Sequence, residues 1–129
     1  MTERELAEMY FDFLTIEGFN PEMEEGFIRF KTEEGVFLVV VDAEDEQYFR
    51  LIFPNFWPIE SEAERLQVLA ACDTATGETK VAKIFTVRDN VWGTIELFLE
   101  RPDHFRAVFQ RCLRALNVAV ATFAEKMRG

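Results

Sequence analysis

The chain has 129 residues, the length of one ordinary domain. Hydrophobic residues make up 49% and charged residues 29% of it, a balance that predicts a folded, soluble core and argues against disorder. With 24 acidic against 14 basic side chains, the net charge is −10, which disfavours nucleic acid as a partner. The acidic excess lies in residues 1–64 (net −13), whereas residues 65–129 are mildly basic (net +3).

The sequence predicts a cytoplasmic location without a membrane partner. The most apolar runs, such as 36–41, are far too short to span a bilayer. Residues 1–5 lack the basic and then apolar plan of a signal peptide. We expect Cys72 and Cys112 to be free thiols that bind no metal, as is usual in a reducing compartment.

The first element is a helix over residues 3–17. Thr2 and Glu5 form a capping box at its start, and Gly18 suits the position after its end. Its apolar stripe contains Leu6, Met9, Tyr10, Phe13 and Ile16.

Three strands follow as an antiparallel meander, over residues 27–31, 36–41 and 47–53. The middle strand is apolar on both faces, which predicts a central strand covered on both sides. An aromatic loop, which contains Phe56 and Trp57, leads from the third strand to the next helix.

The second helix is expected from residue 62 to about Thr76, with Ser61 as its cap and Gly77 as its stop. Its apolar residues lie around most of its circumference, which predicts a helix held between two surfaces. One stripe is formed by Ala63, Leu66, Leu69 and Ala70, while Val68, Ala71, Cys72 and Ala75 lie elsewhere.

A β-hairpin over residues 80–99 comes next, with Asp89 and Asn90 as its turn. This turn places Lys83 directly opposite Glu96, and the opposite charges support that register. One face of the hairpin carries small or aliphatic side chains. The other face carries Phe85, Trp92 and Phe98.

The last helix begins at Pro102 and Asp103 and runs to about Met127. Its apolar stripe contains Phe105, Phe109, Cys112, Leu116, Ala119, Phe123 and Met127. The order of elements is thus helix, three-stranded meander, helix, hairpin, helix, and the fold class is α+β in one domain over residues 1–129.

The residues needed for the common catalytic and metal sites are missing, so we expect neither an enzyme nor a cofactor. The only serine, Ser61, suits a helix cap, and His104 lies two helical turns from Cys112, too far for a nucleophile pair. The acidic run from Asp42 lacks the glycine and the final glutamate of a calcium loop. No glycine-rich phosphate loop occurs. The arginines at 101, 106, 111 and 114 spread over a wide arc and indicate a solvated face more than a nucleic-acid site.

The aromatic residues of the hairpin are the main candidates for protein binding. Phe85, Trp92 and Phe98 can contact the second helix, a second subunit or a peptide, and burial within the monomer is an equally good interpretation. Phe56 and Trp57 extend this candidate set. They also define an alternative function, a small-molecule-sensing domain with a pocket near the aromatic loop and the hairpin.

The sequence resembles the bacterial YbjN-like family over nearly its whole length. The similar stretches are 27–30, 34–38, 48–51, 79–83, 91–96 and the helix start at 102–105. The resemblance implies a type III secretion chaperone-like sandwich. Chaperones of that fold are small, acidic, cytoplasmic homodimers that hold extended segments of other proteins, and the family is described as sensory transduction regulators. It offers no catalytic residues to carry over. We therefore expect a non-catalytic protein-binding domain, chaperone-like or regulatory, that forms a homodimer.

Overall fold

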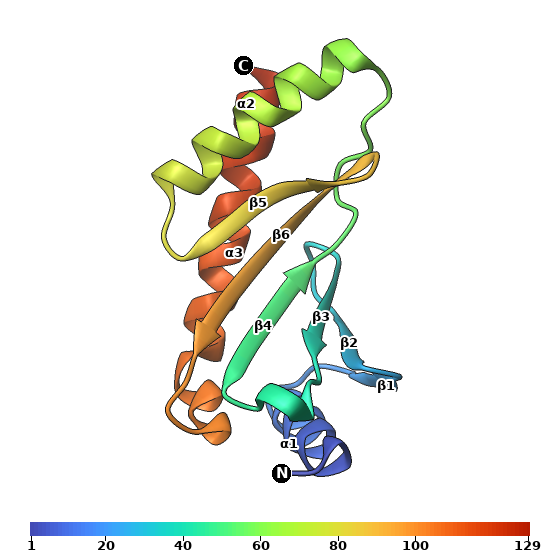
Figure 1. Ribbon diagram of the computed structural model, residues 1–129, viewed down its shortest axis with the longest axis vertical. Helices are drawn as coiled ribbons and strands as arrows, with labels where there is room; N and C mark the ends of the chain where they lie inside the picture. Colours follow the sequence, from blue (N-terminus) through green and yellow to red (C-terminus); the bar gives the residue numbers. More distant parts are fainter.

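A computed structural model describes residues 1–129 as an α+β fold, with three helices and one six-stranded sheet (Figure 1). The α+β class predicted from the sequence is confirmed. In chain order the elements are α1 (Glu3–Ile16), β1 (Glu22–Glu24), β2 (Phe27–Lys31), β3 (Val36–Val40), η1 (Ala43–Asp45), β4 (Tyr48–Phe53), α2 (Glu62–Glu78), β5 (Ala82–Val87), β6 (Asn90–Phe98), η2 (Pro102–His104) and α3 (Phe105–Arg128).

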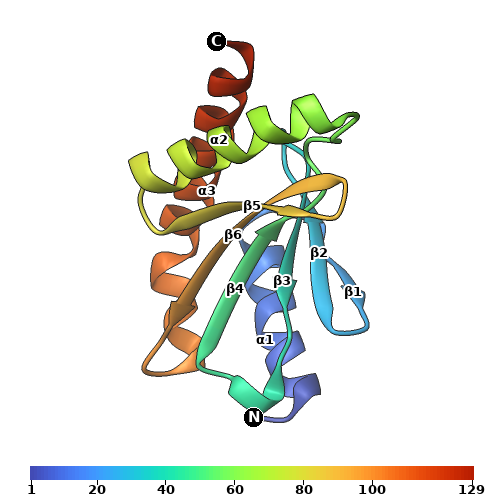
Figure 2. The same ribbon diagram turned by 45° about the horizontal axis from the view of Figure 1, so that its top comes forward.

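The sheet is antiparallel and open, in the order β1-β2-β3-β4-β6-β5. The expected meander is present as β2, β3 and β4, and β6 joins it beside β4. Helices α1 and α3 lie behind one face of the sheet, whereas α2 runs along the outer side of β5 and in front of α3 (Figures 1 and 2). The other face of the sheet has no helix over it.

Helix α1 begins as the sequence predicts. The Thr2 hydroxyl accepts a hydrogen bond from the Glu5 amide, and the Glu5 carboxylate accepts one from the Thr2 amide. The predicted stripe is wrong at its last residue, because Ile16 is 82% exposed. Beyond the helix, Gly18 adopts φ 96, a conformation that favours glycine. The short edge strand β1, stabilised by an ion pair between Glu22 and Arg29, was not predicted.

Two expectations for the middle of the chain are wrong. Strand β3 is buried on one face only, since Phe37 and Val39 are covered while Val36 is 38% exposed. Helix α2 continues through Gly77 to Glu78, and Gly77 does not adopt the positive φ by which a glycine ends a helix.

The hairpin register differs from the predicted one by two residues. Lys83 pairs with Thr94 and not with Glu96, and the turn residues are Arg88 and Asp89. Contacts to this turn from outside the hairpin account for the shift. The Arg65 guanidinium of α2 donates to the Arg88 carbonyl (3.2 Å) and binds the Asp89 carboxylate (2.6 Å). A shift of two preserves which side chains share a face, so the predicted faces remain correct.

The core lies between the sheet and helices α1 and α3. It is dominated by aromatic rings in edge and stacked contacts, and Phe109 of α3 touches Phe13, Phe19 and Phe30. The predicted stripe of α3 is confirmed at every position. The fully buried large side chains are Tyr10, Phe30, Phe37, Phe49, Phe105, Phe109, Phe123, Leu6, Leu14, Ile28, Leu51 and Ile95.

Candidate protein-binding surface

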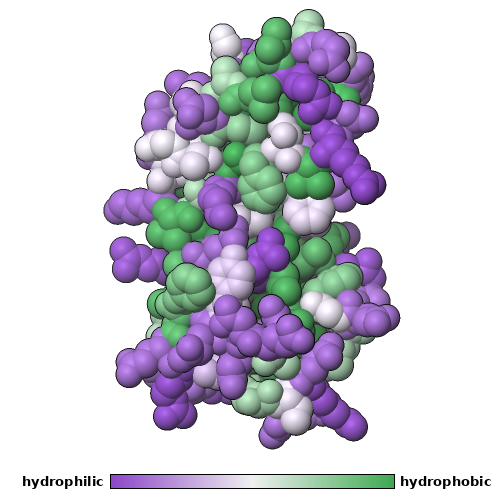
Figure 3. Space-filling model, in the orientation of Figure 1, coloured by the Kyte–Doolittle hydropathy of each residue, from purple (hydrophilic) through white to green (hydrophobic).

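The face of the sheet that no helix covers, here called the outer sheet face, mixes apolar and polar side chains (Figures 1 and 3). Alternation along the strands assigns side chains to it, because successive residues point to opposite faces. Over β3, β4, β5 and β6 the outer sheet face contains Leu38, Val40, Tyr48, Arg50, Ile52, Lys83, Phe85, Val87, Trp92, Thr94, Glu96 and Phe98.

The three aromatic residues predicted for the hairpin all lie on the outer sheet face. Phe98 is 81% exposed and touches Tyr48, with ring centroids 5.4 Å apart. Phe85 and Trp92 are half-buried and pair directly across the two strands. The Trp92 indole N–H donates to the Asn55 side chain (2.9 Å), which fixes the ring on the surface. This arrangement leaves apolar area that nothing in the monomer covers.

Phe56 and Trp57 lie apart from these three. Both rings pack edge-on against Phe123 of α3, with centroids 5.6 and 5.4 Å away, and Phe56 also stacks on Phe53. The aromatic loop is held there by backbone hydrogen bonds between Val91 and both Phe56 and Trp57. The structure therefore divides the predicted set: Phe85, Trp92 and Phe98 share a surface, whereas Phe56 and Trp57 close the end of the core.

A polar cluster occupies the centre of the outer sheet face. The Glu96 carboxylate binds the Lys83 ammonium (2.7 Å) and accepts hydrogen bonds from the hydroxyls of Thr94 (2.9 Å) and Tyr48. The Arg50 guanidinium lies 3.8 Å from the same carboxylate, and its buried Nε has no hydrogen-bond partner. Sequence reasoning found Lys83 and Glu96 as a pair, but not Tyr48 and Arg50, which arrive from a strand distant in sequence.

These contacts set the ionisation of the cluster. Burial alone would raise the pKa of Glu96, but hydrogen bonds from Lys83, Tyr48 and Thr94 outweigh it and lower that pKa to about 2. The hydrogen bond to Glu96 in turn raises the pKa of Tyr48, with burial adding to the effect. Glu96 is therefore a carboxylate at neutral pH. Because two cations, Lys83 and Arg50, lie beside this one carboxylate, the polar cluster has an excess positive charge.

Helix α2 adds a second uncovered apolar strip. Its buried residues are Val68, Ala71, Cys72 and Ala75. The stripe predicted to pack, by contrast, faces outward, with Leu66 73% and Leu69 47% exposed. Nothing in the monomer covers this side, so within one chain α2 is buried on one side only. In both ribbon views α2 lies in front of α3, on the side to which the outer sheet face is turned (Figures 1 and 2). Hydrophobic groups are visible there both at the level of α2 and over the strands (Figure 3).

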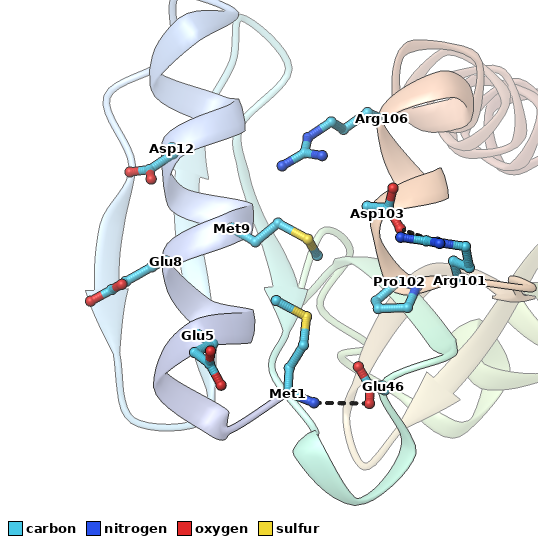
Figure 4. A pocket seen from close by; sticks show the side chains of 10 residues that line it. All are labelled: Met1, Glu5, Glu8, Met9, Asp12, Glu46, Arg101, Pro102, Asp103 and Arg106. Carbon is cyan, nitrogen blue, oxygen red and sulfur yellow. Dashed lines mark hydrogen bonds and ion pairs between the residues drawn. The ribbon is translucent and has the colours of Figure 1, made fainter.

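The largest hollow of the molecule, about 800 Å³, lies between α1 and η2 (Figure 4). Met1 and Met9 point into it, and Arg106 reaches toward it from the start of α3. Glu8 and Asp12 point away. Its lining is mostly charged and of both signs, which does not select one kind of ligand.

The predicted pocket near the aromatic loop and the hairpin corresponds to a hollow of about 520 Å³ at the hairpin turn. Only two of its six lining residues, Val87 and Trp92, are hydrophobic. Neither Phe56 nor Trp57 lines it, because both pack against the core.

The fold and this surface define an α+β protein with a one-sided, open antiparallel sheet. No group of three or more histidine, cysteine, aspartate or glutamate side chains is placed to hold a metal ion. None of the helices combines the length and the apolar character needed to cross a membrane. In comparisons with family models, curated proteins and solved structures, no match to this chain was found.

Proposed function

We propose that this chain is a non-catalytic protein-binding domain, chaperone-like or regulatory, that works as a homodimer. The observation that carries the proposal is the uncovered side of the molecule. Helices protect one face of the sheet, while Phe98 on the outer sheet face is 81% exposed and Leu66 of α2 is 73% exposed. Apolar side chains gathered on one side of a small protein are typical of an interaction surface.

The shape and charge of this side favour a second copy as its occupant. A specific interface buries roughly 800 Å² on each partner, and the outer sheet face and the exposed side of α2 are the two uncovered apolar regions available for it. Nearly all of α2, β5 and β6 belong to residues 65–129, the half with a net charge of +3. Strands β3 and β4 of the N-terminal half also contribute to the outer sheet face, but the residues they add there include no carboxylate.

The order of elements supports the same proposal. Helix, three-stranded meander, helix, hairpin and helix is the order implied by the resemblance to the YbjN-like family and to the type III secretion chaperone-like fold. The additional strand β1 lies at the far edge of the sheet from α2 and does not interrupt that order. Dimeric proteins of that fold hold segments of other proteins, and we propose the same class of activity here.

The test is the oligomeric state of surface variants, measured by light scattering over a range of concentrations. Leu66→Glu and Phe98→Glu each place a charge in the proposed contact without touching the core. Both should convert a dimeric wild type into a folded monomer. Trp92→Glu places a charge in the same contact but perturbs the monomer more, because it also removes the hydrogen bond from the Trp92 indole to Asn55.

Ile16→Glu is the matched control. Ile16 is as exposed as Phe98, but it lies at the end of α1, behind the sheet. This variant should remain dimeric. A wild type that is monomeric at millimolar concentration would refute the homodimer, and a dimer that survives both Leu66→Glu and Phe98→Glu would refute this surface.

A further inference from the structure

A separate cavity of about 220 Å³ lies on the inner side of the sheet, between α3 and the end of β6. The connection from α2 to β5 forms its rim. Six of its eight lining residues are hydrophobic, and the full set is Lys80, Val81, Ile95, Leu97, Val108, Arg111, Cys112 and Ala115. It shares no residue with the surface proposed for dimerisation.

The cavity exists because the two strands of the hairpin differ in length. Strand β5 begins at Ala82, which pairs with Ile95, whereas β6 continues to Phe98. The last residues of β6 therefore have no neighbour on the β5 side. Leu97 points toward α3 at this gap and remains half-buried, as do Val108 and Ala115. The missing piece of strand leaves an apolar space that opens to solvent.

The rim of the cavity is strained. The Ala82 amide donates to the Lys80 carbonyl (2.7 Å), so the chain makes a γ-turn around Val81, whose φ is 67. This is the rare form of the turn, and a β-branched side chain at positive φ is an outlier. The turn also leaves Val81 57% exposed at the rim. Backbone strain of this kind is concentrated at ligand sites, where it holds side chains in place before binding.

The charges at the rim are all of one sign. Lys80 and Arg111 are the only charged residues that line the cavity, although the chain as a whole has a net charge of −10. Both are exposed, and neither takes part in any ion pair of the molecule. An apolar space with two unpaired cations at its mouth complements a ligand with an apolar tail and an anionic head.

We propose that this cavity binds a small amphiphilic carboxylate, with its aliphatic chain between Leu97 and α3 and its carboxylate at Lys80 and Arg111. The volume suits such a ligand, because an apolar cavity of about 150 Å³ already accommodates benzene. The unpaired guanidinium of Arg111 is free to bind both oxygens of a carboxylate.

The two cysteines provide an internal control for the test. Cys112 lines the cavity and Cys72 does not, yet the two are equally buried, at 7% and 6% exposure. The probe is octanoate, and the measurement is the alkylation rate of each thiol, resolved by mass spectrometry. Saturating octanoate should slow the alkylation of Cys112 severalfold more than that of Cys72. Octylamine, which has the same chain and the opposite charge, should change neither rate.

Variants separate the contribution of the two cations to octanoate binding from that of the open volume of the cavity. Arg111→Gln and Lys80→Gln should each weaken octanoate binding, measured by calorimetry, by about two- to fivefold, the range expected for exposed charge pairs. Arg114→Gln, one turn away on α3 and outside the cavity, should leave the affinity unchanged. Ala115→Leu fills the cavity and should abolish binding, whereas Ala121→Leu on the exposed side of the same helix should not.

Three results would overturn the proposal. They are the absence of octanoate binding at millimolar concentration, equal protection of both cysteines, and equal affinity of the Arg111→Gln and Arg114→Gln variants. The outcome is independent of the proposed dimer, because the Leu66→Glu monomer keeps every lining residue and should bind octanoate like the wild type.

Discussion

The two faces of the sheet are made by the same strands but differ in composition. The inner face is built from phenylalanine rings, such as the wholly buried Phe37 and Phe49, that pack with rings of α1 and α3, among them the wholly buried Phe109 of α3. The outer face carries an ion pair at its centre and aromatic rings that remain partly in water. The comparison indicates that the inner face provides the stability of the fold, while the outer face is available for recognition.

The largest expected effect on stability comes from removing a buried phenylalanine on the helix-covered side of the sheet, and the comparison is with an exposed phenylalanine on the outer sheet face. Phe109→Ala removes a fully buried ring that touches Phe13, Phe19 and Phe30. It should lower the free energy of unfolding by about 3–5 kcal/mol, since the cavity it leaves cannot close completely. Phe98→Ala removes a ring that is 81% exposed and should change the free energy by no more than about 0.5 kcal/mol.

Urea unfolding checks both values, at a protein concentration where the wild type is monomeric. If the two variants were equally destabilised, the outer face would contribute to the stability of the monomer as much as the inner face does. The assignment of recognition to the outer face would then fail.

The sequence predicted the inner face better than the outer one. The period of α3 located all of its buried residues except Leu113, because a helix that packs on one side repeats its apolar residues at a fixed spacing. The same reasoning failed for α2. Its apolar residues cover most of its surface, so periodicity could not show that Val68 and Cys72 face inward while Leu66 faces out.

Contacts between segments that are distant in sequence explain the remaining differences between the predicted and the observed structure. The turn at Arg88 depends on Arg65, and the polar cluster around Glu96 depends on Tyr48, neither of which is near in sequence. The cavity beside Leu97 has a local origin, because β5 begins at Ala82 and leaves the end of β6 without a neighbour. No pattern of residues in the sequence predicts that one strand of a hairpin is shorter than the other.

The second prediction concerns the polar centre of the outer face and its pH dependence. The ordinary pKa of Glu96 is 4.5, and its hydrogen bonds lower this to about 2 in the folded chain. Its contribution to stability is therefore complete above pH 4.5 and is lost as the pH falls from 4.5 toward 2. Glu96→Gln should lower the free energy of unfolding at pH 7 by about 1–2 kcal/mol, a value limited by the exposure of Lys83.

Urea unfolding at pH 7, 4.5 and 3 provides the measurement. The difference in the free energy of unfolding between wild type and Glu96→Gln should be constant from pH 7 to about 5 and should become smaller below pH 4.5. Glu125→Gln, at an exposed carboxylate without an ion pair, serves as the control and should show no gap. A Glu96→Gln gap that persisted unchanged at pH 3 would show that the ionised carboxylate is not what stabilises the outer face.

The smallest effect tests the hairpin turn, which decides which residues pair across β5 and β6. Arg88 adopts φ 55, which is unfavourable for a residue with a side chain, whereas Asp89 does not have a positive φ. Arg88→Gly should therefore stabilise the chain by about 0.5 kcal/mol, because its carbonyl still accepts the hydrogen bond from Arg65. Asp89→Gly should instead destabilise it, because it removes the ion pair with Arg65. A reversal of these two signs would place the turn at Asp89 and Asn90, the register expected from the sequence, with Lys83 directly opposite Glu96. The two faces would keep their members even then, since a shift of two residues does not exchange them. The polar centre of the outer face would, however, be a directly opposed pair and not the diagonal contact that the structure shows.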